Sequence, residues 1–224
     1  MRIGFDAKRA FSNFTGLGNY SRDTIRVLHE HFPENQYYLF SPKVIYNPRL
    51  EFINHNLKVI SPKGILDKIF PSFWRSKNII KDLRKNKVDL FHGLSHELPI
   101  GIEKTKIKTV VTIHDLIFLR FPNLFTKIDR KIYEKKFRNA CENSDKIIAV
   151  SNQTKKDIIN FFNIQEKKIE VIYQGCNKIF KTKKKSSEIS DVKKKFNLFE
   201  NYLLYVGTIE ERKNLMTLLN SLKD

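Results

Sequence analysis

Two glycines stand close together near the N-terminus, in residues 15–20 (TGLGNY), before an expected helix. A backbone without side chains lets a phosphate or a sugar approach the amides at a helix N-terminus. Gly16 and Gly18 are therefore candidate ligand-binding residues. A dinucleotide fingerprint would need a third glycine near Ser21 and a tight turn directly after the strand, and the sequence has neither. The alternative is a flexible turn that only caps the helix.

His114 and Asp115 come at the carboxyl end of a strand expected over residues 108–114. Open α/β sheets bind ligands at this edge. Histidine is also the side chain most easily poised for hydrogen bonding or proton transfer near neutral pH. The pair is therefore a candidate catalytic site. The alternative is a core histidine whose hydrogen bonds are satisfied inside the protein.

Two more histidines, His92 and His96, lie in residues 92–99 (HGLSHELP), after another expected buried strand. They are candidates for ligand contact at the same edge. A metal site made of these histidines would rest on proximity alone, because no spacing indicates ligand geometry. Cys141 and Cys176 cannot build a disulfide framework or a four-ligand zinc site.

A third segment, residues 205–215 (YVGTIEERKNL), follows an expected strand with a Gly-Thr turn and then with Arg212 and Lys213. A helix is expected to begin at Asn214. Two cations beside a helix N-terminus form a natural clamp for a diphosphate. A solvated turn would give the same pattern, and this alternative stays open.

Strands and helices alternate along most of the chain, which predicts an α/β fold with a doubly wound, mostly parallel sheet. The best strand predictions, residues 88–92 and 108–114, are apolar on both faces, as buried parallel strands must be. The other expected strands are residues 2–7, 36–40, 57–60, 146–150 and 168–173. The expected helices are residues 19–32, 71–87, 125–143 and 153–162, with Ser151 as the N-cap of the last.

The pattern changes after residue 175. Residues 176–190 contain a lysine run and three serines, which is typical of a linker. A helix near residues 191–196, a strand over residues 202–206 and the helix from Asn214 follow. One strand and part of two helices cannot close a core. We therefore expect residues 1–175 to form one domain and residues 191–224 to be the opening of a second, incomplete α/β domain.

The composition narrows the class of protein. In 224 residues the hydrophobic content is 41%, enough for a core, which excludes wholesale disorder. The net charge of +18 favours acidic partners such as phosphates, anionic lipid or nucleic acid. Residues 63–87, 120–138 and 155–195 carry this excess, and solvated helix faces would also explain it. No nucleic-acid-binding motif accompanies the charge, so we expect no nucleic acid partner.

Residues 64–87 mix apolar and aromatic side chains with basic ones, as an interfacial helix does. The apolar members are Ile65, Leu66, Ile69, Phe70, Phe73 and Trp74, and the basic neighbours are Lys63, Lys68, Arg75, Lys77 and Lys81. The alternative is that Phe73 and Trp74 pack on the sheet. The sequence shows no secretory signal and no apolar run of roughly 20 residues. We expect a cytoplasmic protein with at most peripheral contact with the inner face of a membrane.

Taken together, these segments resemble the family 4 (group 1) glycosyltransferases, retaining enzymes of the GT-B fold with Rossmann-like domains. The matching segments occur in the same order as in the family and span nearly the whole chain. They are Gly16-Leu17-Gly18, residues 110–116 (VVTIHDL), residues 147–151 (IIAVS) with Thr154, Lys155 and Ile158, and residues 205–208 (YVGT) with Arg212, Lys213, Asn214 and Leu215.

The resemblance implies that residues 1–175 bind the acceptor and that the second domain binds a nucleotide-sugar. Gly16 and Gly18 would approach donor phosphates or acceptor, and His114, beside Asp115, would contact the transferred sugar. Arg212 and Lys213 would neutralise the diphosphate leaving group without a metal ion. Asn19, His92 and His96 are candidate acceptor contacts. No cofactor is implied.

The family's Glu-x7-Glu segment would come after Asp224, so we expect most of the donor pocket to be missing and the chain alone to be inactive. The expected function is sugar transfer from a nucleotide-sugar to a glycan or lipid-linked acceptor with retention. The alternative is a non-enzymatic basic module that binds anionic membrane or nucleic acid. An NAD-dependent dehydrogenase would need the tight glycine turn that this chain lacks.

Overall fold

The computed structural model describes residues 1–45, 48–50 and 57–222. It divides into two compact units, Met1–Gly175 and Cys176–Asp224, and each is described by itself. None of the described helices is both long and apolar enough to cross a bilayer.

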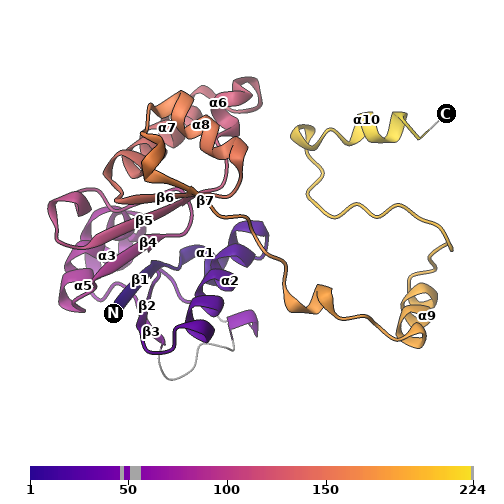
Figure 1. The fold of residues 1–224 in the computed structure, drawn as a ribbon, viewed down its shortest axis with the longest axis horizontal. Coiled ribbons are helices and arrows are strands. Elements are labelled where there is room, and N and C mark those ends of the chain that lie inside the picture. The colour runs from indigo at the N-terminus through magenta and orange to yellow at the C-terminus, as the bar shows by residue number, and fades with distance from the viewer. Residues whose placement is uncertain (46–47, 51–56, 223–224) are drawn as a thin grey trace. The chain divides into compact units, whose positions relative to one another are not determined.

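The first unit contains a seven-stranded sheet in which all the paired strands are parallel (Figure 1). The strand order β3-β2-β1-β4-β5-β6-β7 is Rossmann-like, so the predicted fold class is confirmed. β1 lies between β2 and β4, where Ile3 is in register with Tyr37 of β2 and Leu90 of β4. The strands are β1 Arg2–Asp6, β2 Gln36–Phe40, β3 Leu57–Ile60, β4 Leu90–Gly93, β5 Lys108–Ile113, β6 Lys146–Ala149 and β7 Ile169–Val171.

Helices cover both faces of this sheet, and each face has its own core cluster (Figure 1). One cluster joins Phe5 and Leu39 to Ala10 of α1 (Lys8–Ser12) and Ile25 of α2 (Gly16–His31). The other packs β4, β5 and β6 against α5 (Ile79–Lys85), α7 (Lys127–Asn143) and α8 (Asn152–Phe162). Burial on both faces explains why the strands are apolar throughout. α6 (Ile117–Arg120) links β5 to α7.

The crossover from β3 to β4 differs from the prediction of one helix over residues 71–87. It consists of α3 (Ile65–Ile69), α4 (Pro71–Phe73), a π-helical turn at Trp74–Asn78 and α5. The π-helical turn carries Trp74 inward, where it is fully buried, and its Nε1 donates to Asp82 Oδ2 at 2.8 Å. The prediction that Trp74 belongs to an interfacial surface is therefore wrong, because a large ring with a satisfied N–H gains more in the core.

Short-range signals place the other helices well. Ser151 caps α8 as predicted, since its Oγ accepts from the backbone N–H of Thr154 at 3.0 Å. Thr126 caps α7 in the same way, with Asp129 N–H at 3.1 Å. The segment Lys8–Ser12, which the pattern leaves without an element, forms α1.

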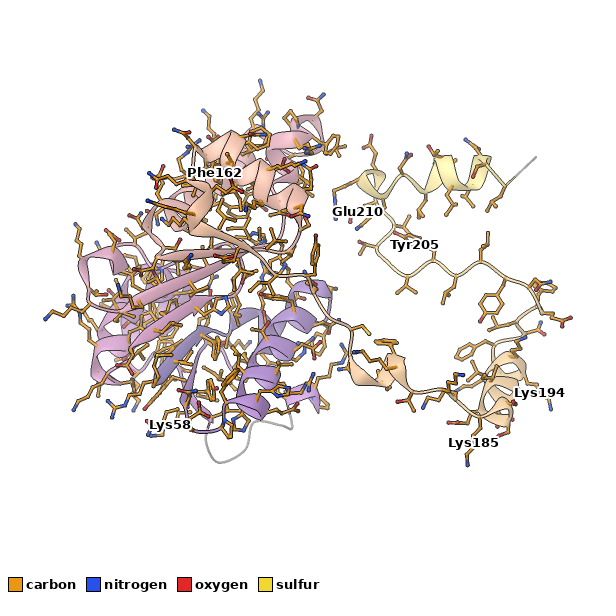
Figure 2. The ribbon with its side chains drawn as sticks, viewed as in Figure 1. Lys58, Phe162, Lys185, Lys194, Tyr205 and Glu210 are labelled. Atoms are coloured by element: carbon orange, nitrogen blue, oxygen red, sulfur yellow. The ribbon has the colours of Figure 1, made fainter. Side chains whose placement is uncertain are left out.

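The second unit contains α9 (Ser186–Lys195), α10 (Leu215–Asn220) and 3-10 turns at Lys178–Lys181 and Glu211–Lys213. None of its described residues is buried (Figure 2). The strand predicted over residues 202–206 is wrong: the segment pairs with no strand in the described part of the chain, and Val206 is 84% exposed. The predicted linker also ends early, because α9 begins at Ser186. Of the last predicted helix, residues 223–224 lie outside the described residues.

Candidate functional site

The candidate site lies at the carboxyl edge of the first unit's sheet. β1 ends at Asp6, β4 at Gly93 and β5 at Ile113, and the strand order reverses between β1 and β4. Ligands of open α/β sheets bind outside the strand ends at such a switch point. His114 directly follows β5, and His96 lies in the loop after β4 with a left-handed backbone (φ 65°).

His114 is held by hydrogen bonds from three directions. Its Nε2 lies 3.0 Å from the carbonyl oxygen of Leu94, and Gln174 Nε2 lies 3.3 Å from its Nδ1. Its backbone N–H donates to His96 Nδ1 at 3.4 Å. Because a carbonyl oxygen only accepts, Nε2 carries the hydrogen and Nδ1 is an acceptor that the exposed amide of Gln174 covers. Displacing that amide would give a ligand hydroxyl an acceptor atom.

Aromatic rings fix the orientation of the imidazole. Tyr20 of α2 meets His114 edge-on with centroids 4.6 Å apart, and the His96 ring lies 5.1 Å away. His96 in turn stacks on Phe137 of α7 at 4.3 Å. These contacts bring the helix that begins in the glycine segment against the loops after β4 and β5. The structure therefore assembles one site from segments almost 100 residues apart.

Burial lowers the pKa of three histidines at this edge. For His114, burial is the main cause of the lowered pKa, whereas the Leu94 carbonyl and Asp115 raise that pKa. Burial lowers the pKa of His92 to about 4, and His114 adds to that effect. Burial, His114 and Arg9 hold the pKa of His96 well below its usual range. All three rings are therefore neutral at pH 7.

The structure corrects the expectation for His92. Its side chain is buried, and its Nε2 is 2.8 Å from Thr112 Oγ1, which also lies 2.9 Å from the Tyr20 hydroxyl. His92 thus supports the packing beneath His114 and is not available to an acceptor. Asp115 is exposed beside the site, and its Oδ1 accepts a hydrogen bond from the backbone N–H of Ile117, the first residue of α6, at 3.4 Å.

The two glycines play different parts. A Cβ at Gly18 would lie 1.8 Å from the backbone oxygen of Asn13, so this glycine is needed for close packing and its expected contact with a ligand gains no support. A Cβ at Gly16 would meet nothing within 4 Å, which leaves that backbone open to a ligand. The Asn13 side chain shapes the turn, because its Oδ1 accepts from the N–H groups of Thr15 at 2.9 Å and Gly18 at 3.1 Å.

A buried arginine that the sequence analysis missed holds this turn in place. Arg22 Nη1 donates to the backbone oxygens of Ala10 and Asn13, both at 2.8 Å. Its Nη2 donates to Asn19 Oδ1 at 2.7 Å, and Arg49 Nη1 lies 3.3 Å from the same oxygen. Asn19, an expected acceptor contact, is exposed. Its side-chain carbonyl oxygen already accepts hydrogen bonds from these two arginines.

A second missed group is the ion-pair network around Arg75, in the π-helical turn. Its Nε donates to Asp6 Oδ2 at 2.9 Å and its Nη1 to Glu97 Oε2 at 2.7 Å. Burial opposes the charge on Arg75, but the two carboxylates outweigh it and raise the pKa of the guanidinium. An aspartate that ends an apolar first strand was the sequence signal for this pair, since buried charges need partners.

Arg212 and Lys213 belong to the second unit, whereas the other candidate residues belong to the first. Both lie in the exposed 3-10 turn before α10, and Arg212 Nη2 is 2.6 Å from Glu210 Oε1. Among the described residues, no group of three or more His, Cys, Asp or Glu side chains could hold a metal ion.

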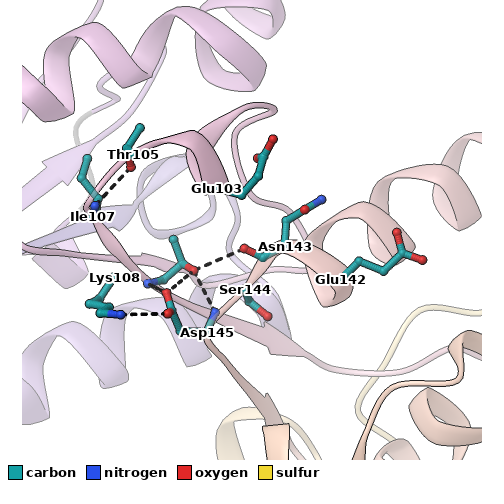
Figure 3. Close-up of a pocket in the computed structure, with 9 residues that line it drawn as sticks. Glu103, Thr105, Ile107, Lys108, Glu142, Asn143, Ser144 and Asp145 are labelled. Atoms are coloured by element: carbon teal, nitrogen blue, oxygen red, sulfur yellow. Dashed lines mark hydrogen bonds and ion pairs between the residues drawn. The ribbon is translucent and has the colours of Figure 1, made fainter.

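A pocket of about 230 Å³ lies at the opposite edge of the sheet, where β5 and β6 begin (Figure 3). Asp145 Oδ2 accepts from Thr109 N at 2.8 Å and Oδ1 pairs with Lys108 Nζ at 3.2 Å. Burial opposes ionisation of Asp145, but these partners outweigh it and lower its pKa. The polar groups of this pocket thus join the strand starts and are not poised for chemistry.

Solved structures share the fold of this chain. A glycosyltransferase of Rickettsia africae ESF-5 has a TM-score of 0.53 at 15% identity, over 89% of this chain and 50% of that one. Anabaena Alr3699/HepE, solved in complex with UDP and glucose, has a TM-score of 0.59 at 14% identity, over 87% of this chain and 50% of that one.

In sequence, the chain is similar to mannosyltransferases of Escherichia coli. The O-antigen chain mannosyltransferase B of Escherichia coli is 29% identical over 140 residues, which are 62% of this chain and 35% of that protein. The serotype-specific mannosyltransferase WbdA of Escherichia coli is 28% identical over 58% of this chain and 16% of its own length. The chain thus spans well under half of these relatives. Residues 14–178, more than half of the chain, match the profile of the family, and the chain belongs to Glycosyltransferase Family 4.

Proposed function

We propose that the protein containing this chain transfers a hexosyl group from a nucleotide-sugar to a glycan or lipid-linked acceptor, with retention of configuration. The observation that carries the proposal is the neutral His114 at the switch point, whose acceptor nitrogen is covered by the exposed amide of Gln174. The family, the mannosyltransferase relatives and the UDP-bound structure of HepE support it.

The roles follow from the chemistry of each group. His114 Nδ1 accepts a hydrogen bond from a hydroxyl of the transferred sugar, and the open backbone at Gly16 lets the substrates come close. Arg212 and Lys213 neutralise the diphosphate leaving group, so that no metal ion or cofactor is needed. The nucleotide-sugar and the acceptor are the partners, and nucleic acid is not one. The reaction takes place in the cytoplasm.

Sugar transfer by the full-length protein tests this proposal, with UDP-glucose and a nucleotide-linked mannose as donors. His114→Ala should lower kcat by roughly 100-fold or more, the scale of a well-placed polar contact. The control, His31→Ala on the exposed end of α2, should keep full activity. NMR of the product should show the donor's anomeric configuration. Unchanged turnover per folded His114→Ala molecule would contradict the role of His114, and an inverted product would contradict retention.

We also propose that the first unit touches an anionic membrane surface through an apolar patch on α3 and α4. The side chains of Ile65, Leu66, Ile69, Phe70 and Phe73 are each more than half exposed. Exposed lysines flank them at positions 63, 68, 77 and 81. Contiguous apolar groups rimmed by cations are what an interfacial surface requires, and a lipid-linked acceptor would be presented there.

Vesicle co-sedimentation tests the membrane contact. Binding should require anionic lipid, fall steeply with salt, and weaken in a Phe70→Ser, Phe73→Ser double variant. The matched control is Phe32→Ser, which changes an exposed phenylalanine next to α2. Equal binding to neutral vesicles, or no binding to anionic vesicles at low salt, would refute this contact while leaving the transferase proposal intact.

A further inference from the structure

Two cations at the carboxyl end of β1 form no hydrogen bond or ion pair through their side chains among the described residues. Lys8 and Arg9 are the first residues of α1, are half-buried, and make no side-chain hydrogen bond or ion pair in that part of the chain. The nearby carboxylates are already engaged. Arg75 binds both Asp6 and Glu97.

The charge around Lys8 is therefore unbalanced. Lys136 of α7 also approaches Glu97, with Nζ 3.4 Å from Oε1. The network around Asp6 and Glu97 therefore contains four cations, Lys8, Arg9, Arg75 and Lys136, and two carboxylates. Burial lowers the pKa of Lys8, and Arg75 and Arg9 lower it further, against the opposing effect of Glu97 and Asp6. The excess is two positive charges, and a phosphate group at neutral pH carries close to two negative charges.

This excess charge lies beside the proposed transfer centre. Arg9 lies close enough to His96 to help lower its pKa, and the His96 ring is 5.1 Å from that of His114. Since His96 Nδ1 accepts from the backbone of His114, the neutral ring carries its hydrogen on Nε2 and has a further donor to offer. Two cations and one neutral donor thus lie near the switch point.

We propose that Lys8 and Arg9 bind a phosphate group of the acceptor, so that the acceptor is a phosphate-linked sugar or lipid. This inference rests on the proposed transferase function, in which the donor's diphosphate goes to Arg212 and Lys213 of the second unit. A phosphate on the first unit belongs to the acceptor for that reason. It would anchor the acceptor while leaving its attacking hydroxyl near His114.

A binding experiment on the 224-residue chain tests this site without requiring activity. Glucose 1-phosphate should bind at low salt, whereas glucose should not. Lys8→Gln and Arg9→Gln should each weaken binding at least tenfold, with unchanged circular dichroism. The matched control is Lys106→Gln, which removes the same charge from an exposed lysine near the start of β5. No binding by the unaltered chain, or equal weakening by Lys106→Gln, would overturn the proposal.

Further arms separate the sources of the phosphate. Tighter binding of a lipid monophosphate in neutral vesicles than of glucose 1-phosphate would assign a lipid-linked acceptor, and equal binding would assign a soluble sugar phosphate. UDP that bound more tightly than either, with the same dependence on Lys8 and Arg9, would place the donor there and overturn the assignment.

Kinetics of the full-length enzyme distinguish a failure of the phosphate site from a failure of the transferase proposal. Lys8→Gln should raise the KM for a phosphate-linked acceptor at least tenfold with little change in kcat, and should leave a phosphate-free acceptor unaffected. Sugar transfer with an unchanged KM would overturn the phosphate site but not the transferase. Phosphate binding without transfer from any nucleotide-sugar would overturn the transferase, and with it the assignment of the phosphate to an acceptor.

Discussion

The two units of this chain carry similar sequence patterns but very different structures. In Met1–Gly175, each apolar strand pairs with at least one neighbour in the sheet, and its apolar side chains pack in a core cluster. In the second unit, residues 202–206 are as apolar as those strands but have no neighbour and stay irregular. An apolar segment thus forms a strand only when a neighbouring strand pairs with it, because an unpaired strand leaves its N–H and C=O groups to water.

The largest expected effect of this difference is in hydrogen exchange. Amides of β1, β4 and β5 should exchange only through global unfolding, which is typically 5–15 kcal/mol uphill, and should be protected by at least about 1,000-fold. Amides of residues 176–222 should exchange within a few-fold of unstructured peptides. Limited proteolysis should cut within residues 176–190 and leave residues 1–175 intact. Protection of that stretch and cooperative unfolding of the whole chain would show that the units are not independent.

The next largest difference between the units should be in how much their ion pairs contribute to the free energy of unfolding. Asp6→Asn removes one partner of a buried pair with Arg75, and we expect the free energy of unfolding to fall by about 4 kcal/mol. Glu210→Gln breaks the exposed pair with Arg212 and should leave the melting temperature unchanged. Chemical denaturation of both variants measures the contrast. A small loss for Asp6→Asn would mean that the Arg75 network does not stabilise the first unit.

Two glycine substitutions within α2 should have unequal effects on the stability of the first unit. Gly18→Ala forces a Cβ against the Asn13 oxygen, so the backbone must shift, and we expect a loss of about 3 kcal/mol. Gly16→Ala has open space and should change stability by less than about 0.5 kcal/mol. In the second unit, Gly207→Ala meets the end of the flexible Tyr205 side chain and should not change the unfolding of the first unit. Equal losses at Gly16 and Gly18 would contradict the packing argument.

Between pH 6.5 and 4, loss of stability through histidine protonation should be confined to the first unit, because all six histidines of the chain lie there. His92 has a folded pKa of about 4 and an unfolded pKa near 6.5. The unfolded state therefore binds more protons between these values, and stability falls as the pH drops from 6.5 towards 4. The contribution lost by pH 5 is about 2 kcal/mol. His92→Gln should flatten this dependence, and removing residues 176–224 should not; an unchanged slope in His92→Gln would contradict the assignment.

The sequence predicted the parts of the fold that depend on local pattern. Apolar runs identified the seven strands, and Ser151 marked the start of α8 because capping needs only neighbouring residues. The π-helical turn could not be predicted, since it depends on a hydrogen bond between the buried Trp74 and the half-buried Asp82. The strand over residues 202–206 was predicted wrongly because pattern alone does not say whether a neighbour is present.

The candidate site was predictable in position but not in detail. A histidine after an apolar strand indicates the carboxyl edge of a sheet, which is how His114 was found. The burial of His92 and the role of Arg22 were not visible, because both depend on contacts between segments far apart in sequence. Lys8 and Arg9 did not stand out among 42 basic residues until the structure showed which of their neighbours were already paired.

The place of β1 between β2 and β4 has a consequence for how the chain is made. β1 is synthesised more than 80 residues before its partner on one side, β4, which begins at Leu90. At about 5–20 residues per second, a ribosome leaves that edge of β1 open for roughly 5–20 s. During this time an apolar strand with free N–H and C=O groups is available to any other strand nearby. The reversal of strand order that creates the binding edge therefore also leaves one edge of β1 in need of protection until β4 has been made.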